Sequence, residues 1–167
     1  ANAISAAFQF DQKKQHLNDF MPSRLFIYYN ERSLEGTVNQ DAGAEIRDGI
    51  KTMITNGVCK EKTWPYKINK FQSKPCAKCY TEALKNQILK YQRLTSIDEY
   101  KICLTHGYPF VFGFSVYESF ESEEVAQTGI LNMPTQNEKL IGGHAVMAVG
   151  FDDNKKVFIV RNSWGSD

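Results

Sequence analysis

The stretch that decides the fold is GGHAVMAVGF at residues 142–151, followed by RNSWG at residues 161–165. Two apolar runs of strand length, AVMAVGF and KVFIVR, are joined by DDNK, a composition typical of a tight turn. The pattern predicts an antiparallel β-hairpin. A hairpin centred on Asp153 places His144 and Asn162 opposite each other on the two strands.

This pairing predicts a hydrogen bond between the two side chains. Directly opposed residues have Cβ atoms about 5 Å apart, so the Asn162 oxygen can accept from one imidazole nitrogen and turn the other nitrogen outward. A neutral Asn suits a cysteine nucleophile, because a thiolate-imidazolium pair needs an oriented ring more than a third charge. The alternative is that His144 is a hydrogen-bonded core histidine and Asn162 merely ends a strand.

The neighbours of the pair favour a functional site. Gly142 and Gly143 precede the histidine and remove side chains where a substrate backbone can approach closely. Trp164, two residues beyond Asn162, is placed to shield the bond between Asn162 and His144 from water.

The composition is that of a globular protein. The 167 residues are 42% hydrophobic and 23% charged, which suits one domain or two small lobes around a shared core. A net charge of +1 argues against a polyanion as obligatory partner, so we expect no nucleic-acid partner. No apolar run approaches the length of about 20 residues that spans a bilayer. The start ANAISAAFQF has neither a Met nor a basic n-region, which indicates an excised piece.

The two halves of the chain differ in texture. Residues 1–107 carry helical patterns at about residues 1–19, 41–57, 75–91 and 96–107, with Asp41 and Ser96 as N-caps and Gly57 and Gly107 as stops. Residues 108–167 open with the strand-like PFVFGFSVY and continue through an acidic loop, ESEEV, to the hairpin. The sequence predicts a single α+β domain over 1–167, in which a mainly helical lobe (1–107) packs on a mainly β lobe (108–167).

The cysteines do not suggest a disulfide scaffold. Four of them, Cys59, Cys76, Cys79 and Cys103, are sparse for a chain of this size. One C-x-x-C with two scattered cysteines could supply four zinc ligands, but structural zinc sites usually bring their ligands in two close pairs. Buried or idle thiols are favoured, and we expect neither a metal nor a cofactor. The compartment and the oligomeric state stay open.

The motif pair GGHAVMAVGFDD and RNSWG resembles the C-terminal part of papain-like cysteine peptidases, the group that includes the cathepsins. It covers about residues 140–165 and is specific, whereas the helical first half and the residues Trp64-Pro65-Tyr66 fit the family more loosely. The resemblance implies a helical N-terminal lobe, an antiparallel β-barrel lobe and a site in the groove between them. It also implies hydrolysis of peptide or protein substrates through a Cys-His-Asn triad.

The resemblance assigns roles to five residues. His144 would be the general base and the ion-pair partner of the thiolate, Asn162 would orient it, and Trp164 would cover their bond. Gly143 and Ala145 would contact the substrate. The segment DAGA at residues 41–44 falls where the family has a richer glycine segment on the cleft rim, and it departs from that pattern.

The nucleophile is expected upstream of the chain. In papain-like peptidases the cysteine lies near the mature N-terminus, with the His and Asn about 130–150 residues downstream. Residues 1–14 contain no cysteine, and ANAISAAFQF resembles the residues that follow the nucleophile in microbial members. A cysteine and one more residue would therefore precede Ala1, and the chain as given is expected to be inactive alone.

Cys79 is an internal alternative, because PCAKCY superficially matches the family's C-G-S-C-W pattern and a helix N-terminus would acidify this thiol. Too few residues separate it from His144 to hold the helical lobe, and Lys78 replaces a small residue of the motif. Two other functions stay open beside the peptidase. One is a catalytically silent papain-like binding or structural module, and the other is an acyl-transferring cysteine enzyme with the same triad.

Overall fold

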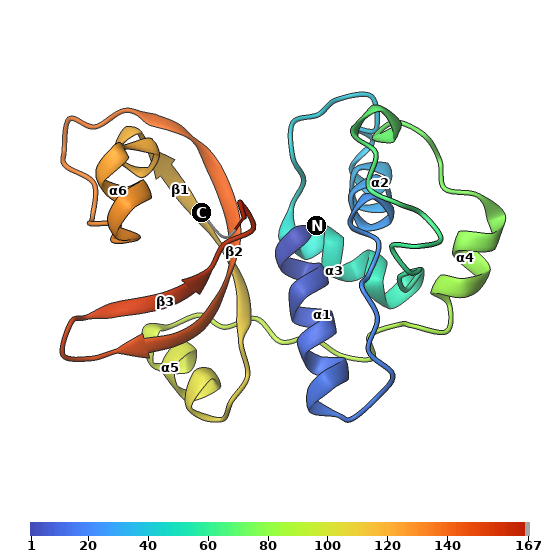
Figure 1. Cartoon of the computed structure of the whole chain (residues 1–167), viewed down its shortest axis with the longest axis horizontal. Helices are drawn as coiled ribbons and strands as arrows, with labels where there is room; N and C mark the ends of the chain where they lie inside the picture. Colours follow the sequence, from blue (N-terminus) through green and yellow to red (C-terminus); the bar gives the residue numbers. More distant parts are fainter. Residues whose placement is uncertain (166–167) are drawn as a thin grey trace.

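The fold consists of two lobes that lie side by side, with the N-terminus between them (Figure 1). It is seen in a computed structural model that describes residues 1–165. The helical lobe contains α1 (Asn2–Lys14), α2 (Arg24–Glu35), α3 (Ile46–Thr55), η1 (Ile68–Lys70) and α4 (Ala77–Ala83). The sheet lobe contains α5 (Ile97–Thr105), β1 (Phe110–Tyr117), η2 (Glu118–Glu121), α6 (Glu123–Thr128), β2 (Leu140–Asp152) and β3 (Val157–Arg161). The predicted α+β class is confirmed.

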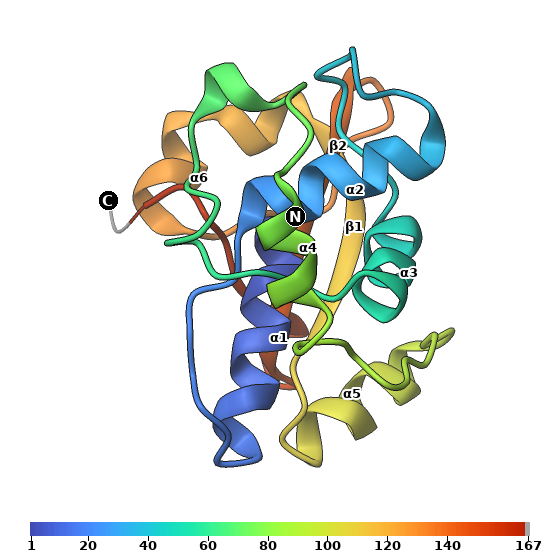
Figure 2. The same ribbon diagram turned by 90° about the vertical axis from the view of Figure 1, so that its right-hand side faces the viewer.

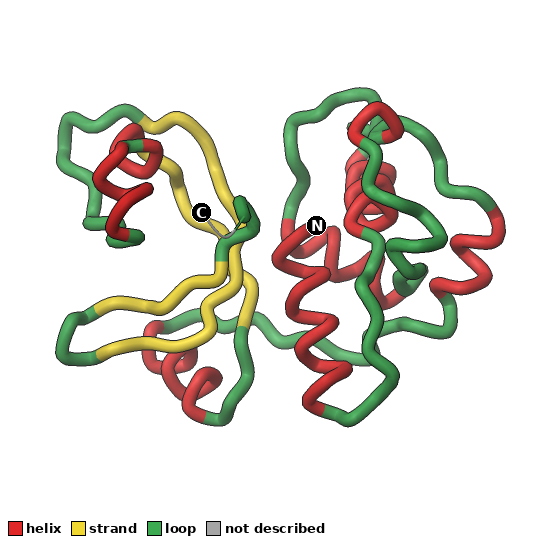
Figure 3. The backbone as a smooth tube through the Cα atoms, viewed as in Figure 1, coloured by secondary structure: helices red, strands yellow, loops and turns green. Residues whose placement is uncertain are grey.

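The strands gather in one lobe and most of the helices in the other, as the colouring of Figure 3 shows. In the view of Figure 2 the helical lobe stands in front of the sheet, with α1 running beside β1 and β2. Among residues 1–165, no helix has the length and hydrophobicity to cross a bilayer.

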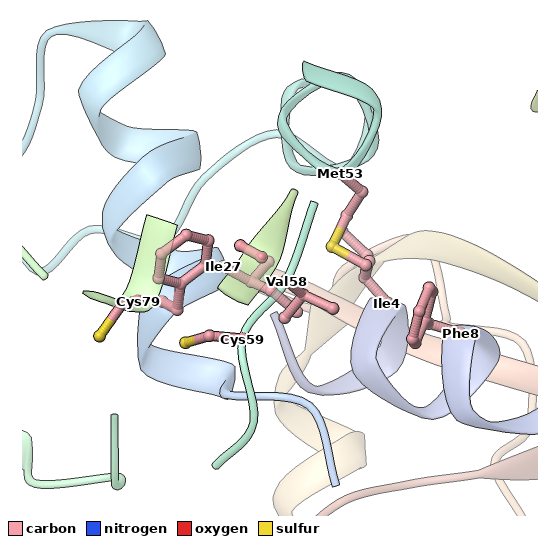
Figure 4. Packing of buried hydrophobic residues seen from close by; sticks show 9 residues of the cluster. Ile4, Phe8, Ile27, Met53, Val58, Cys59 and Cys79 are labelled. Carbon is pink, nitrogen blue, oxygen red and sulfur yellow. The ribbon is translucent and has the colours of Figure 1, made fainter. Parts of the chain in front are cut away.

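The helical lobe has one continuous hydrophobic core. Its buried members are Ile4, Phe8, Phe26, Ile27, Met53, Val58, Cys59, Cys79 and Ala83. Figure 4 shows Ile4 and Phe8 of α1 next to Met53 of α3. Each fully buried large apolar side chain contributes about 1.5–3 kcal/mol of transfer free energy. This cluster therefore holds α1 against the rest of the lobe.

We did not predict α2 from the sequence, although both of its ends carry recognisable signals. Ser23 is the N-cap, and its Oγ accepts from the Phe26 N–H at 3.1 Å while donating to the Trp64 carbonyl at 2.6 Å. At the other end, Gly36 adopts the left-handed conformation, with φ of +74°. A serine cap followed twelve helical residues later by such a glycine is a common helix frame.

Two predicted helices are shorter than expected. α3 begins at Ile46 with Glu45 as N-cap, and not at Asp41, because the Asp41 carboxylate accepts a hydrogen bond from the Tyr28 hydroxyl at 2.5 Å. α4 ends at Ala83, because the chain beyond it bonds to the segment that follows α3. There the Val58 N–H donates to the Asn86 carbonyl at 3.1 Å.

The acidic stretch predicted as a loop is helical. It forms η2 and α6, and Ser122 caps α6 by accepting from the Val125 N–H at 3.3 Å. Gly129 ends α6 with φ of +67°. The glutamates of its first turn suit the positive end of the helix dipole.

The sheet has the order β1-β2-β3, and both pairs are antiparallel, so the predicted hairpin is confirmed. The predicted register is wrong. In the structure, the last pair of β2 and β3 is Met147 with Arg161. The turn occupies residues 153–156, and the register shifts after Ala148. His144 pairs instead with Phe114 of β1.

α5 lies in the helical half of the sequence but packs on the sheet, beside the β2–β3 hairpin (Figure 1). Its Tyr100 ring lies 4.9 Å from the Phe110 ring of β1 and 6.2 Å from the Phe158 ring of β3. Lys101 forms an ion pair with Asp153 in the hairpin turn. This helix therefore supports the end of the sheet away from His144.

Candidate active site

His144 and Asn162 are joined by a hydrogen bond of 2.8 Å between the imidazole Nε2 and the amide Oδ1. The same oxygen accepts from the Ser163 N–H at 2.9 Å, which fixes the orientation of the amide, because its nitrogen cannot accept. A neutral His144 therefore carries its proton on Nε2 and leaves Nδ1 free. The predicted hydrogen bond is confirmed although the strand register is not, because Asn162 reaches back from beyond the last strand pair.

Three aromatic rings surround the imidazole of His144. Phe114, its partner across the sheet, lies 5.9 Å away between ring centroids, Phe120 lies 5.8 Å away, and Trp164 lies 5.2 Å away. Trp164 is still 62% exposed, so it covers the imidazole from the solvent side. Together the rings restrict rotation of the imidazole and limit the water that reaches its bond to Asn162.

Phe120 is a site residue that the sequence analysis missed. It lies in η2, and its ring contacts both the imidazole and the Trp164 indole, the latter at 5.1 Å. The available signal was a single aromatic residue inside the acidic run ESFESEE, which gives no indication of a partner. Only the packing of η2 against β1 and β2 shows its place.

Glu138 fixes the loop that carries Phe120. Its carboxylate accepts from the Ser119 N–H at 2.7 Å and from the Thr135 N–H at 3.2 Å. Hydrogen bonds hold the pKa of Glu138 below its ordinary value. Those from Ser119 have the largest effect, and the one from Thr135 has a smaller effect. The bonded form is the carboxylate, so the loop is best anchored above the ordinary pKa of this group.

The two glycines before His144 are not required by the fold. A Cβ added at Gly142 would meet no atom within 4 Å, and one at Gly143 would meet only the Phe114 carbonyl, at 3.9 Å. The space beside this part of β2 is therefore open. Ala145, the next residue, is half-buried and faces the other lobe.

A cavity of about 190 Å³ lies between the lobes. Its helical side is formed by Asn2, Ala3, Ser5, Ala6 and Gln9 of α1 with Met21 and Arg24, and its sheet side by Ala145, Val146, Met147, Arg161, Asn162 and Ser163. The first turn of α1 and Asn162 thus face the same space. This is the groove in which the sequence analysis expects the site.

The DAGA segment at residues 41–44 lies in the helical lobe, between α2 and α3, and does not line this cavity. The Tyr28 hydroxyl donates to Asp41 and accepts from the Gly43 N–H at 3.2 Å, which holds the segment in place. The chain then enters α3, where Ile46 approaches the strand β1. A Cβ at Gly113, the strand partner of Ala145, would lie 3.3 Å from the Ile46 side chain.

None of the four cysteines is hydrogen-bonded to His144 within residues 1–165. Cys59 and Cys79 are fully buried in the helical lobe, and Cys103 donates to the Tyr108 carbonyl at the end of α5. Burial raises the pKa of the Cys79 thiol, contrary to the expectation that the helix start would lower it. Cys79 is therefore a poor candidate for the nucleophile of the peptidase reaction. In the described part of the chain, no three His, Cys, Asp or Glu side chains are placed to hold a metal.

Comparisons with known proteins agree on one family. A sequence profile described as the papain family of cysteine proteases matches residues 36–167. An uncharacterised peptidase C1-like protein of Acanthamoeba polyphaga mimivirus is 53% identical over 176 residues, which cover 99% of this chain and 57% of the viral protein. The crystal structure of xylellain, a cysteine protease from Xylella fastidiosa, matches with a TM-score of 0.90 at 46% identity, covering 98% of this chain and 66% of xylellain. The chain thus spans little more than half of the viral relative.

Proposed function

Because this chain belongs to the papain family of cysteine proteases, we propose that the intact protein is a cysteine endopeptidase with a Cys-His-Asn triad. The observation that carries the proposal is the 2.8 Å hydrogen bond between His144 Nε2 and Asn162 Oδ1, which leaves Nδ1 free for a thiol. His144 is the general base in this proposal, Asn162 orients it, and Trp164 covers their bond.

The nucleophile in this proposal is a cysteine that precedes Ala1. Support comes from the interlobe cavity, because Asn2 and Ala3 of α1 line it together with Asn162. A residue just before Ala1, the N-cap of α1, lies over the positive end of a helix of 13 residues. That position and a cationic His144 both lower the pKa of a thiol.

The proposed reaction proceeds through an acyl-enzyme. The thiol passes its proton to Nδ1 of His144, and the thiolate attacks the peptide carbonyl carbon. The cysteine N–H at the helix start stabilises the oxyanion that forms. His144 then returns its proton to the leaving amine, the C–N bond breaks, and a water molecule deprotonated by the same imidazole hydrolyses the thioester.

The open space beside Gly142 and Gly143 supports a role for this part of β2 in substrate binding. We propose that an extended peptide binds between the lobes along this part of β2, with Gly143 and Ala145 in contact with it. A side chain at position 143 would occupy this space without disturbing the fold. The substrate is therefore a peptide or an unfolded protein segment.

The test is active-site labelling of the protein extended beyond both ends of residues 1–167. It is treated with an epoxide inhibitor of thiol enzymes, and the adduct is mapped by peptide mass spectrometry. We expect one adduct, just before Ala1, which disappears in His144→Ala. His106→Ala is the matched control, because this histidine binds only the Ile102 carbonyl at the exposed end of α5, and we expect full labelling.

Other outcomes would redirect the proposal. An adduct at Cys79 would mean that the internal thiol is the nucleophile, and the absence of any selective adduct would favour a silent papain-like module. Faster product formation when an amine is added, with the amine found in the product, would indicate acyl transfer in place of hydrolysis. Residues 1–167 alone are expected to be inactive and to carry no adduct that depends on His144.

A further inference from the structure

The Cys76-Ala77-Lys78-Cys79 motif has no role in the proposed peptidase, yet its two thiols are close together. The Cys76 Sγ lies 3.3 Å from the Cys79 Sγ. A disulfide bond is about 2 Å long, so closing the pair requires only a small side-chain movement. Both sulphurs are on one short segment at the start of α4, where Cys76 is the N-cap. A bridge between them therefore leaves the rest of the helical lobe in place.

The two thiols differ in exposure. Cys76 is exposed to solvent, whereas Cys79 is fully buried. The Cys79 N–H, followed by the Cys79 thiol, lowers the pKa of Cys76, whereas burial raises that of Cys79. An exposed thiol with a lowered pKa beside a protonated, buried one is the arrangement of an attacking and a resolving cysteine.

The surroundings of Cys76 favour an anionic reaction partner. Lys74 and Lys78 flank it and are both exposed, and neither forms an ion pair within residues 1–165. Two ammonium groups on exposed residues close in sequence to an exposed thiol attract a small molecule that carries carboxylates. The surroundings of Cys79 differ from those of Cys76. Cys79 packs with Cys59 at the end of the core cluster, where solvent does not reach (Figure 4).

We propose that Cys76 and Cys79 form a second reactive site, which exchanges thiols with anionic disulfides of low molecular weight such as oxidised glutathione. The Cys76 thiolate attacks one sulphur of the disulfide, the S–S bond breaks, and one thiol leaves after taking a proton from water. The sulphur of Cys79 then attacks the Cys76 sulphur, the mixed disulfide breaks, and the second thiol leaves with the proton that Cys79 gives up. Two electrons pass from the protein dithiol to the disulfide, and a Cys76–Cys79 bond forms.

The experiment uses the reduced full-length protein, incubated with oxidised glutathione, quenched by alkylation and digested with trypsin. Trypsin cleaves after Lys78, between the two cysteines, so their disulfide is seen as two cross-linked peptides that a reductant separates. We expect this cross-link in the wild type. Cys79→Ala should trap a stable glutathione adduct on Cys76. Cys76→Ser removes one of the two sulphurs, so no cross-link can form, and the release of reduced glutathione should be at least about tenfold slower than in the wild type.

Cys103→Ser is the matched control, because its half-buried thiol lies on α5 and burial raises its pKa, so the cross-link should form at the wild-type rate. A lasting glutathione adduct on Cys76 in the wild type would overturn the proposal, since Cys79 would then not resolve it. A Cys59–Cys79 bridge would also overturn it. Cys76→Ser replaces an exposed side chain and keeps the test valid if the Cys79 variant does not fold. The cross-link between Cys76 and Cys79 is read out independently of peptidase activity. A cysteine upstream of Ala1 would lie in a different tryptic peptide and would not be confused with either thiol.

Discussion

The two lobes divide stability and chemistry between them. The helical lobe holds the continuous core cluster, whereas the buried hydrophobic residues of the sheet lobe are Val116, Val146, Met147 and Ala148 among residues 1–165. On β3, Ile159 remains 53% exposed. The sheet lobe nevertheless carries the His144–Asn162 pair, held by aromatic contacts and hydrogen bonds. A change in the first lobe should therefore alter the stability, and a change around the pair should alter the reaction.

The strongest test of this division is His144→Ala in the full-length protein. We expect a loss of kcat/KM of at least about 10⁴-fold, because the proposed general base and ion-pair partner of the thiolate would disappear together. The melting temperature should stay close to that of the wild type, since His144 is only half-buried. Peptide hydrolysis and thermal denaturation check both parts.

Asn162→Ala is the companion variant, and we expect it to weaken turnover by only about 10- to 100-fold, because it removes an orienting bond and not the base. An Asn162 variant as inactive as the His144 variant would contradict a purely orienting role. A large fall in the melting temperature for either variant would show that the His144–Asn162 pair also contributes to stability, and would contradict the division of stability and chemistry between the lobes.

The next largest effect is expected in the helical core. Phe26 is 0% exposed and packs against the Tyr80 ring at 5.0 Å between centroids. Phe26→Ala should lower the free energy of unfolding by about 3–5 kcal/mol, since it leaves a cavity in a packed core. Leu89→Ala is the control, because this side chain is 96% exposed and should change the stability little. Denaturant titration measures both; an equal loss for the two variants would refute the location of the core.

Helix caps compare the lobes at a finer scale. Ser23 caps α2 while buried, and its hydroxyl also donates to the Trp64 carbonyl at 2.6 Å, whereas Ser122 caps α6 in a partly exposed position. Ser23→Ala should cost about 2 kcal/mol, because it also leaves a partly buried carbonyl without its donor, and Ser122→Ala about 0.5–1 kcal/mol. Chemical denaturation of the two variants gives the difference. Equal costs would show that burial adds nothing to the Ser23 cap.

The last prediction concerns Phe120. Phe120→Ala removes the ring that packs on both His144 and Trp164, so we expect kcat to fall by about tenfold with KM unchanged, the size of one lost aromatic contact. Phe120→Tyr should restore most of the rate, because it keeps the ring. Steady-state kinetics of the two variants decide the matter. A rise in KM alone would indicate that Phe120 contacts substrate and does not position the imidazole.

The hairpin and the His144–Asn162 bond were predictable from the sequence because both rest on local signals. Apolar runs and a turn composition define the hairpin. The His144 and Asn162 side chains reach each other although the strand register differs from the predicted one. The observed register is set first by the turn over residues 153–156, and the bulge between Ala148 and Gly150 then shifts it again; the sequence shows neither which residues form the turn nor the direction of the shift. The α+β class was predictable because residues 1–107 carry helical patterns and residues 108–167 carry strand-like runs.

Features set by distant contacts were not predictable. Phe120 became a site residue only when η2 packed beside β2, and nothing near it in sequence indicates this. For the two thiols of the C-x-x-C motif, the local pattern suggested that Cys79 has a lowered pKa. Burial in the core instead raises the pKa of Cys79, and the thiol with the lowered pKa is Cys76. α2 is a different case, because Ser23 and Gly36 marked its ends, and its mixture of aromatic and β-branched residues hid the helical period.

The order of the two lobes along the chain has a consequence for synthesis on the ribosome. All members of the core cluster lie at or before Ala83, whereas the His144–Asn162 bond requires residue 162. Domains generally fold as units, with the N-terminal one first, as the chain emerges. We therefore expect the helical lobe to become resistant to proteolysis in stalled nascent chains that still lack β2. A growing chain would then acquire the proposed general base only after the lobe that carries the proposed nucleophile has folded.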